Sequence, residues 1–416
     1  ITEKIAWLNK SEQFLFTTVV GFTIISLFIT LLLLIKLIYI WLIVFVWICL
    51  WVSPAIWKSD TTYLYKPLKI IFFSFKEYKI LWILFFLNTL PALLPARRND
   101  GMFYHLAYPL EWILNNGITI NPSMQYPVYT FQFHSLYING LIFNSVTFTH
   151  LLSWIFGVFG CLGIISLLQR LNVSKWIAYI SGISFFLTPV IQEYLTLSYL
   201  DIPIITLMLL SIYGFYLKDI RNNINGTYIT AGLITAFFIS IKLSNVLYVP
   251  LFLFLGYLHY NKTSIKVFFK YFFILFLLGG IWYFRNWILT GDPLSPSINL
   301  LIGKDDPYLN KIDYMGFVSA IKGNLSYNLK DILLTPYRMF KAGADPELSS
   351  WPVNGYIFVF FLSPLFLPLF FREKRWYLLL FAWYSVVVWF YIGYLIRYAH
   401  YLAFAVVISG LIVQFI

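Results

Sequence analysis

The sequence predicts an all-α integral membrane protein with about twelve transmembrane helices and two large loops on one side of the membrane. Of the 416 residues, 60% are hydrophobic and only 11% are charged. An ordinary globular chain is about a quarter charged, so this chain has too little charged surface for a water-soluble body of its size. Apolar stretches of about 20 residues, the length that crosses a bilayer, recur along the whole chain between short polar breaks.

The expected spans follow one another closely. They are residues 14–35, 38–57, 79–96, 147–169, 175–192, 198–217, 227–242, 244–260, 271–289, 352–371, 376–394 and 398–416. The first is too long for a signal-peptide core and no small-residue cleavage site follows it, so we expect it to be retained. Residues 1–78 are expected to form two N-terminal spans with a basic cytoplasmic linker, and residues 79–416 a second, larger transmembrane domain.

The net charge of +12, from 29 Lys and Arg against 17 Asp and Glu, is explained by topology. With a cytoplasmic N-terminus, 17 of the 29 basic residues fall in breaks on the cytoplasmic side, as the positive-inside rule requires. The charge therefore indicates orientation, and no nucleic-acid partner is expected. The two cysteines, Cys49 and Cys161, lie in apolar runs and cannot form a disulfide framework or a Cys-based zinc site.

This orientation places two large loops, residues 97–146 and 290–351, on the extracytoplasmic side. The first contains an amphipathic stretch, Gly101–Asn116, that we expect to lie along the membrane interface with a kink at Pro109. Its apolar stripe consists of Phe103, Leu106, Leu110, Ile113 and Leu114.

Five ionisable residues lie at the extracytoplasmic ends of different spans, and such residues are functional candidates. They are Asp100, Asp201, Lys242, Arg285 and Arg397. A helical bundle could bring them round one cleft at the membrane face. Lipid-linked anionic substrates could meet an acceptor there.

Each candidate has a simpler interpretation. Asp100 can act as a general base or as the N-cap of the helix that follows it, and Asp201 can equally be a cap. His105 and Tyr104 could orient a phosphate or a sugar, or be interfacial side chains. The arginine forks match phosphate oxygens, but either could be an interface anchor. Lys242 could bind an anion or extend to the interface.

Other chemistries lack their motifs. The five histidines include no i, i+4 pair and no HExxH sequence, which disfavours a zinc hydrolase. The sequence also has no Walker loop, no GxSxG and no DxD. We expect no required metal and no other cofactor.

Taken together, these segments resemble the GT-C superfamily of multi-spanning glycosyltransferases, in the manner of protein mannosyltransferases and aminoarabinose transferases. The likeness covers residues 79 to 416. It rests on Asp100 with Tyr104-His105-Leu106, on Ser198-Tyr199-Leu200-Asp201-Ile202-Pro203, on Ser240-Ile241-Lys242-Leu243-Ser244, on Arg285-Asn286 with Thr290-Gly291-Asp292-Pro293 and Pro296, and on Arg397-Tyr398.

The sequence departs from the family pattern at three places. Two extra spans precede the first-loop Asp, where many members have one, and Asp292 stands where Asn is commoner. Asn99 precedes Asp100, so the paired acids of metal-dependent oligosaccharyltransferases are absent. The resemblance therefore implies a metal-independent member.

The resemblance implies an inverting transfer of sugar from a polyprenyl-phosphate donor to a lipid, glycan or protein acceptor, at the outer face of a bacterial plasma membrane. Asp100 would be the base. The donor phosphate would bind Arg285 and Arg397 with Lys242 or His105, and the substrate would contact Tyr104, Glu111, Asp201, Asn286 and Tyr398. A polymerase or ligase using a diphosphate-linked glycan is the nearest alternative. A lipid or solute transporter and a membrane scaffold are further ones.

Overall fold

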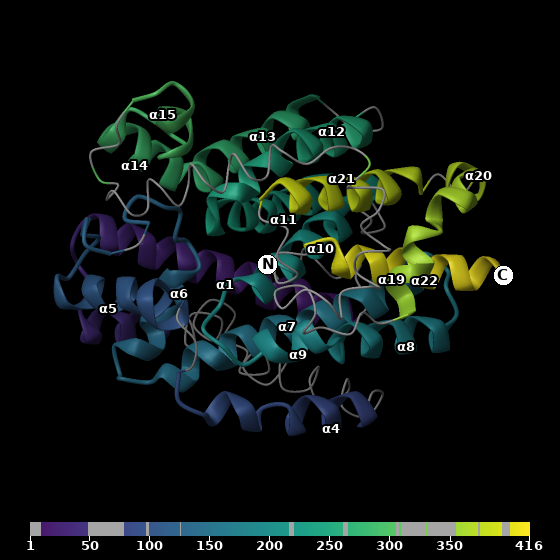
Figure 1. Ribbon diagram of the computed structural model, residues 1–416, viewed down its shortest axis with the longest axis horizontal. Helices are drawn as coiled ribbons and strands as arrows, with labels where there is room; N and C mark the ends of the chain where they lie inside the picture. The colour runs from purple at the N-terminus through teal and green to yellow at the C-terminus, as the bar shows by residue number, and fades with distance from the viewer. Residues whose placement is uncertain are drawn as a thin grey trace.

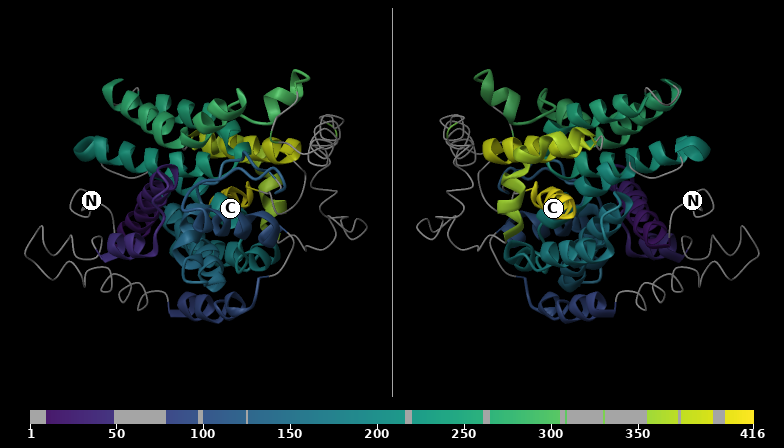
Figure 2. Two further views of the ribbon diagram at one scale, coloured as in Figure 1. Left: turned by 90° about the vertical axis from the view of Figure 1, so that its left-hand side faces the viewer. Right: turned by 90° about the vertical axis from the view of Figure 1, so that its right-hand side faces the viewer.

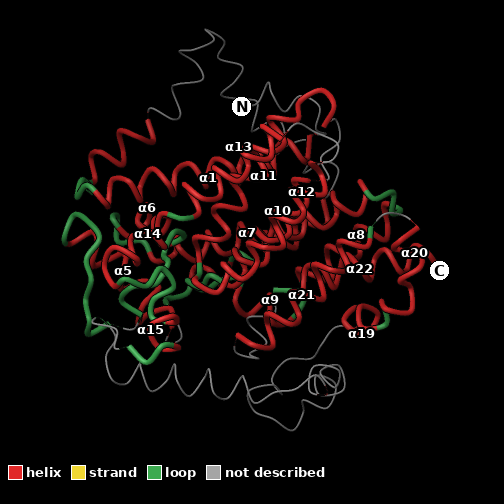
Figure 3. The backbone as a smooth tube through the Cα atoms, turned by 90° about the horizontal axis from the view of Figure 1, so that it is seen from above, coloured by secondary structure: helices red, strands yellow, loops and turns green. Residues whose placement is uncertain are grey.

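The computed structural model describes residues 10–48, 79–96, 100–124, 126–215, 220–260, 265–304, 308, 330, 355–372, 375–392 and 400–416. This part of the chain is built of helices and loops, without a strand (Figure 3). The helices are α1 (Lys10–Leu34), α4 (Lys79–Leu87), η2 (Leu90–Leu93), η3 (Gly101–Leu106), α5 (Ala107–Leu114), α6 (His134–Leu141), α7 (Val146–Arg170), α8 (Lys175–Phe186), α9 (Pro189–Tyr194), α10 (Asp201–Phe215), α11 (Ile220–Ile241), η4 (Leu243–Tyr248), α12 (Val249–Tyr260), α13 (Ile265–Gly279), α14 (Ile281–Thr290), α15 (Ser297–Leu301), α19 (Gly355–Phe361), η6 (Ser363–Phe366), α20 (Leu367–Arg372), α21 (Trp376–Ile392) and α22 (Leu402–Phe415).

The helices are arranged in layers. Figures 1 and 2 show α4 at one edge, α7 and α8 beside it, and α12 and α13 at the opposite edge. At the centre, every residue of α10 is buried, and α10 packs against α7 and α11. Small residues allow the close approach of α10 and α11, because a Cβ added to Gly214 would lie 2.9 Å from Cβ of Ala231.

Several helices have the length and composition of membrane spans. In the described ranges, α1 from Glu12 and the whole of α7 are long and apolar enough to cross a membrane. Helices α13 and α14 would form a third span if they act as one, with a bend of 51° between them. The bend falls at Gly279 and Gly280, and glycine pairs are a common cause of kinks. The protein is thus a helical membrane protein.

Other expected spans are interrupted. Residues 79–96 form α4 and η2, residues 244–260 lie within η4 and α12, and residues 352–371 fall across α19, η6 and α20. Pro91 and Pro364 lie in the first turns of η2 and η6, where proline cannot continue a preceding helix. The number of membrane crossings, their orientation and the division of the chain after residue 78 stay predictions.

The amphipathic stretch after Asp100 is less regular than expected. Residues 101–106 form a π-helical turn, η3, and α5 follows it directly. The irregularity therefore lies one turn before Pro109, not at it. Pro109 is the third residue of α5, within the continuous run of η3 and α5.

Most of the apolar stripe of this stretch faces outward, and its aromatic face packs on the protein. Phe103, Leu110 and Leu114 are exposed, whereas Leu106 of the stripe is buried, contrary to expectation, and Tyr108 and Trp112 are fully buried. This is the orientation expected of a helix whose apolar stripe meets lipid.

A buried charged cluster joins three helices at the end of α10 that is remote from Asp201. Arg170, the last residue of α7, donates from Nε and Nη2 to the carboxylate of Glu12 in α1. The hydroxyl of Tyr213 in α10 donates to the same carboxylate. At a rise of about 1.5 Å per residue, Tyr213 lies roughly 18 Å along α10 from Asp201.

Candidate active site

The π-helical turn brings three candidate side chains together. Its wider i→i+5 turns place Tyr104 and His105, four and five residues after Asp100, near the same face of the helix. The Asp100 side chain makes no capping hydrogen bond, so capping is not its role here. π-Helical turns are frequent at functional sites.

Asp100, Tyr104 and His105 line a pocket of about 400 Å³ whose walls come from four parts of the chain. The turn after Asp100 forms one wall, and the segment before α6 contributes Tyr129, Thr130 and Phe131, with His134 at the start of α6. The start of α10 and the end of α11 close the pocket with Tyr199, Leu200, Asp201, Ile241 and Lys242.

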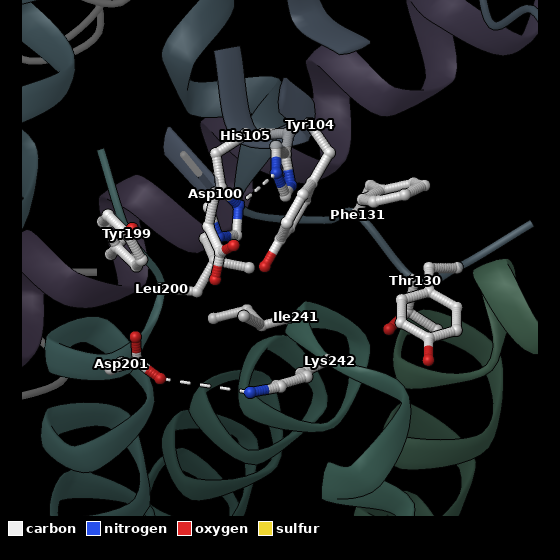
Figure 4. Close-up of a pocket in the computed structure, with 12 residues that line it drawn as sticks. Asp100, Tyr104, His105, Thr130, Phe131, Tyr199, Leu200, Asp201, Ile241 and Lys242 are labelled. Atoms are coloured by element: carbon white, nitrogen blue, oxygen red, sulfur yellow. Dashed lines mark hydrogen bonds and ion pairs between the residues drawn. The ribbon is translucent and has the colours of Figure 1, made fainter. Parts of the chain in front are cut away.

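An ion pair forms the wall opposite Asp100. The Nζ of Lys242 lies 4.0 Å from Oδ1 of Asp201, and both side chains are largely buried. In Figure 4 the Asp100 carboxylate and the Tyr104 hydroxyl point across the pocket toward this pair. The pocket contains two carboxylates, of Asp100 and Asp201, and one ammonium, of Lys242. The formal charge of these three groups together is therefore negative.

The loop that leads into Asp201 is held by hydrogen bonds from two neighbouring helices. The backbone carbonyl of Tyr199 accepts hydrogen bonds from the hydroxyl of Tyr137 at 3.1 Å and from Oγ of Ser153 at 3.2 Å. These donors belong to α6 and α7. The loop that enters α10 is therefore fixed to two neighbouring helices, and with it the position of the Asp201 carboxylate.

His105 is paired with a histidine that the sequence did not single out. Nδ1 of His105 lies 2.9 Å from Nε2 of His134, and their rings stack at 5.1 Å. Burial lowers the pKa of His134 to about 3, because desolvation disfavours the imidazolium, while the Phe131 carbonyl opposes the shift. His134 is thus a neutral partner that fixes the orientation of His105.

Arg285, Asn286 and Glu111 do not line this pocket. The guanidinium of Arg285 lies 5.4 Å from the ring centroid of Trp282 and donates to Oδ1 of Asn286 at 3.1 Å. Asn286 is fully buried. The remaining two candidates, Arg397 and Tyr398, lie outside the described residues.

Asp292 has a structural position. One carboxylate oxygen accepts from the backbone N–H of Leu294 at 2.7 Å, and the other accepts from Ile298 and Asn299, both at 2.9 Å. Gly291 supplies the left-handed backbone, at φ 73°, that ends α14. The acid at this position therefore builds the turn that follows α14.

The pocket residues that sequence reasoning missed are Tyr129, Thr130, Phe131, His134 and Tyr199. His134 is 29 residues from His105 and has no motif spacing to reveal it. Within the described ranges, no three His, Cys, Asp or Glu side chains are placed to hold a metal ion.

A second cavity is an apolar groove of about 760 Å³ between η4, α12, α13 and α14. Its lining includes Val249, Leu253, Phe272, Phe276, Phe284 and Trp287. Phe276 and Trp287 are exposed, so the groove is open along one side. Phe284 and Trp287 flank Arg285 in the sequence, and the groove therefore runs beside the helix that carries this cation.

Comparison with known proteins gives two remote likenesses. No protein-family model matches the sequence, and no curated protein does. The crystal structure of the Archaeoglobus fulgidus oligosaccharyltransferase in the apo form is similar over 81% of this chain and 50% of its own, with 15% identity and a TM-score of 0.49. The archaeal oligosaccharyltransferase AglB from the same organism, in complex with an inhibitory peptide and a dolichol-phosphate, has the same coverage, 16% identity and a TM-score of 0.46.

The chain thus spans about half the length of these two structures. A likeness of this degree carries no argument about activity. The case for a function rests on the pocket and its surroundings.

Proposed function

We propose that this protein is a membrane glycosyltransferase that moves a sugar from a polyprenyl-phosphate donor to an acceptor hydroxyl. The observation that carries the proposal is the pocket. In it a carboxylate on a π-helical turn faces an ion pair across a space lined with aromatic side chains. A sugar offers hydroxyls to the polar groups and apolar ring faces to the aromatic ones.

The proposed reaction uses Asp100 as the general base. The acceptor oxygen attacks the anomeric carbon from the side opposite the phosphate, and Asp100 takes the hydroxyl proton. As the new carbon–oxygen bond forms, the bond to the phosphate oxygen breaks and its electron pair leaves with the polyprenyl phosphate. The anomeric configuration inverts. Base catalysis of this kind contributes about 10²- to 10⁴-fold.

The charge distribution calls for a further cation at the phosphate. The pocket holds two carboxylates against one ammonium, and Arg285 lies on α14, the helix whose Phe284 and Trp287 line the apolar groove. We propose that the polyprenyl chain lies in this groove and the phosphate binds Arg285, with Arg397, Lys242 and His105 as further donors. Cationic stabilisation of a leaving group is commonly a large catalytic effect.

The substrate contacts are proposed on the same basis. Tyr104 and Asp201 face the pocket and can bind sugar hydroxyls. Further substrate-binding residues are proposed to be Glu111, Asn286 and Tyr398. The reaction is proposed to occur at the extracytoplasmic face of a bacterial plasma membrane.

The test is to incubate the purified protein with a panel of labelled polyprenyl-phosphate sugars and to measure released polyprenyl phosphate. Diphosphate-linked glycans belong in the same panel. Release from a monophosphate donor supports the proposal, and release from diphosphate donors alone supports a polymerase or ligase. Movement of intact lipid across proteoliposomes without release would support a transporter. Consumption of no donor would overturn the enzyme interpretation.

A further inference from the structure

A buried glutamine joins the pocket wall to the helix that carries Arg285. Gln132 is fully buried and directly follows Phe131, which lines the pocket. Its Oε1 accepts a hydrogen bond from Nε1 of Trp282 at 2.8 Å. An indole nitrogen can only donate, so this contact also determines which end of the amide is the oxygen.

The other end of the amide is bound to α1. Nε2 of Gln132 donates to Oγ of Ser26 at 2.8 Å and to Oγ1 of Thr30 at 3.0 Å. Both hydroxyls are fully buried. The amide thus uses both of its N–H groups and its oxygen within the protein.

The backbone of Gln132 is held as firmly as its side chain. Its N–H donates to the carbonyl of Ser240 at 3.2 Å, two residues before Lys242. Its carbonyl accepts from Oγ of Ser26 and Oγ of Ser135, each at 2.7 Å. One residue therefore connects α1, α6, the end of α11 and α14.

Trp282 transmits this arrangement to Arg285. Its ring stacks on Trp112 at 5.8 Å and lies under the guanidinium of Arg285. The indole cannot rotate without losing its hydrogen bond to Gln132, and a buried donor left unpaired is costly. The contact with Gln132 thus fixes the ring over which Arg285 lies.

We propose that Gln132 is a positioning residue for the donor: it holds Trp282, and through it Arg285, in register with the pocket wall and with Lys242. The inference rests on the proposed function, since it concerns where the donor phosphate binds. A displacement of about 1 Å at a reacting group can lower the rate by about 10²-fold, so positioning of this kind has a measurable effect.

The experiment compares two hydrogen-bond contacts of Gln132, the one to Trp282 and the one to Thr30, in the full-length protein. Gln132→Met removes the acceptor of Trp282, and Thr30→Val removes one contact to α1 while leaving the Trp282 contact in place. We expect Gln132→Met to lower the donor kcat/KM about tenfold or more with an unchanged acceptor KM, and Thr30→Val to change the donor kcat/KM less than about twofold. Trp282→Phe, which keeps a ring but loses the N–H, is the second variant if Gln132→Met does not fold.

A double-mutant cycle tests whether the effect passes through Arg285. In an Arg285→Ala background, Gln132→Met should lower the donor kcat/KM no further, because residues that act together are not additive. Full additivity, or equal effects of Gln132→Met and Thr30→Val, would overturn the inference and leave the proposed function intact. If the wild-type protein consumes no polyprenyl-phosphate donor, the proposed function fails and this inference fails with it.

Discussion

The buried cluster of Glu12, Arg170 and Tyr213 allows a quantitative prediction about stability. The carboxylate of Glu12 is 0% exposed and the side chain of Arg170 is 16% exposed. Arg170→Met would remove the guanidinium that donates twice to this buried carboxylate. Removing one member of a buried ion pair typically costs about 3–5 kcal/mol, so we expect the free energy of unfolding to fall by about that amount.

Replacing the whole cluster should cost far less. The triple variant Glu12→Leu, Arg170→Met and Tyr213→Phe removes the carboxylate, the guanidinium and the phenolic hydroxyl together. Apolar replacement of buried ion pairs is often neutral or even stabilising. Tyr213→Phe is needed because the phenol would otherwise lose its acceptor, at about 1–3 kcal/mol.

The assay is SDS-induced unfolding in mixed micelles, followed by tryptophan fluorescence. Arg372→Met is the matched control, since Arg372 also ends a helix but is exposed, and it should cost less than about 1 kcal/mol. A loss below about 1 kcal/mol for Arg170→Met would indicate a solvent-screened pair. A triple variant as unstable as Arg170→Met would also refute the reasoning.

Three further predictions concern the site. His134→Gln can keep the hydrogen bond to Nδ1 of His105 and should retain most turnover. His134→Phe should lower turnover about tenfold, since an unpaired buried group costs about 1–3 kcal/mol. Equal losses of turnover in the two variants would contradict this. Arg285→Lys keeps the charge but loses the planar guanidinium on Trp282. The donor KM should therefore rise about tenfold, and the acceptor KM should not change. Unchanged donor binding would exclude a role for the planar guanidinium. Because the pKa of folded His134 is about 3, against an ordinary 6.5, the unfolded chain takes up a proton between these values that the folded protein excludes. Stability should therefore fall as the pH falls from 6.5 towards 3, and His134→Gln should show a shallower fall in SDS titrations at pH 7 and pH 5; identical pH profiles would contradict the assignment.

Helix positions were predictable where the apolar runs are long and unbroken. The span expected at 147–169 is α7, Val146–Arg170, and the one expected at 376–394 corresponds to α21, Trp376–Ile392. Periodicity did not predict the π-helical turn after Asp100, because its residues fit an α-helical pattern. Tertiary packing also decides which face of that stretch is buried.

The meeting of Asp100, Asp201 and Lys242 could be predicted because antiparallel helices bring alternate ends to the same side. The exact partners could not. His134 meets His105, and Gln132 meets Trp282, across 29 and 150 residues, and neither pair has a local signature. Arg285 was expected with the other candidates, but it lies over Trp282 and does not line the pocket.

The central claim is that Asp100 accepts the proton of the acceptor hydroxyl in the pocket. The most direct measurement is the single-turnover rate of Asp100→Asn with the donor that the wild-type protein consumes, at saturating acceptor. The amide preserves the size of the side chain but is not a base, so the account predicts a loss of about 10²- to 10⁴-fold with unchanged donor binding and folding. A rate equal to that of the wild type would remove Asp100 from the mechanism.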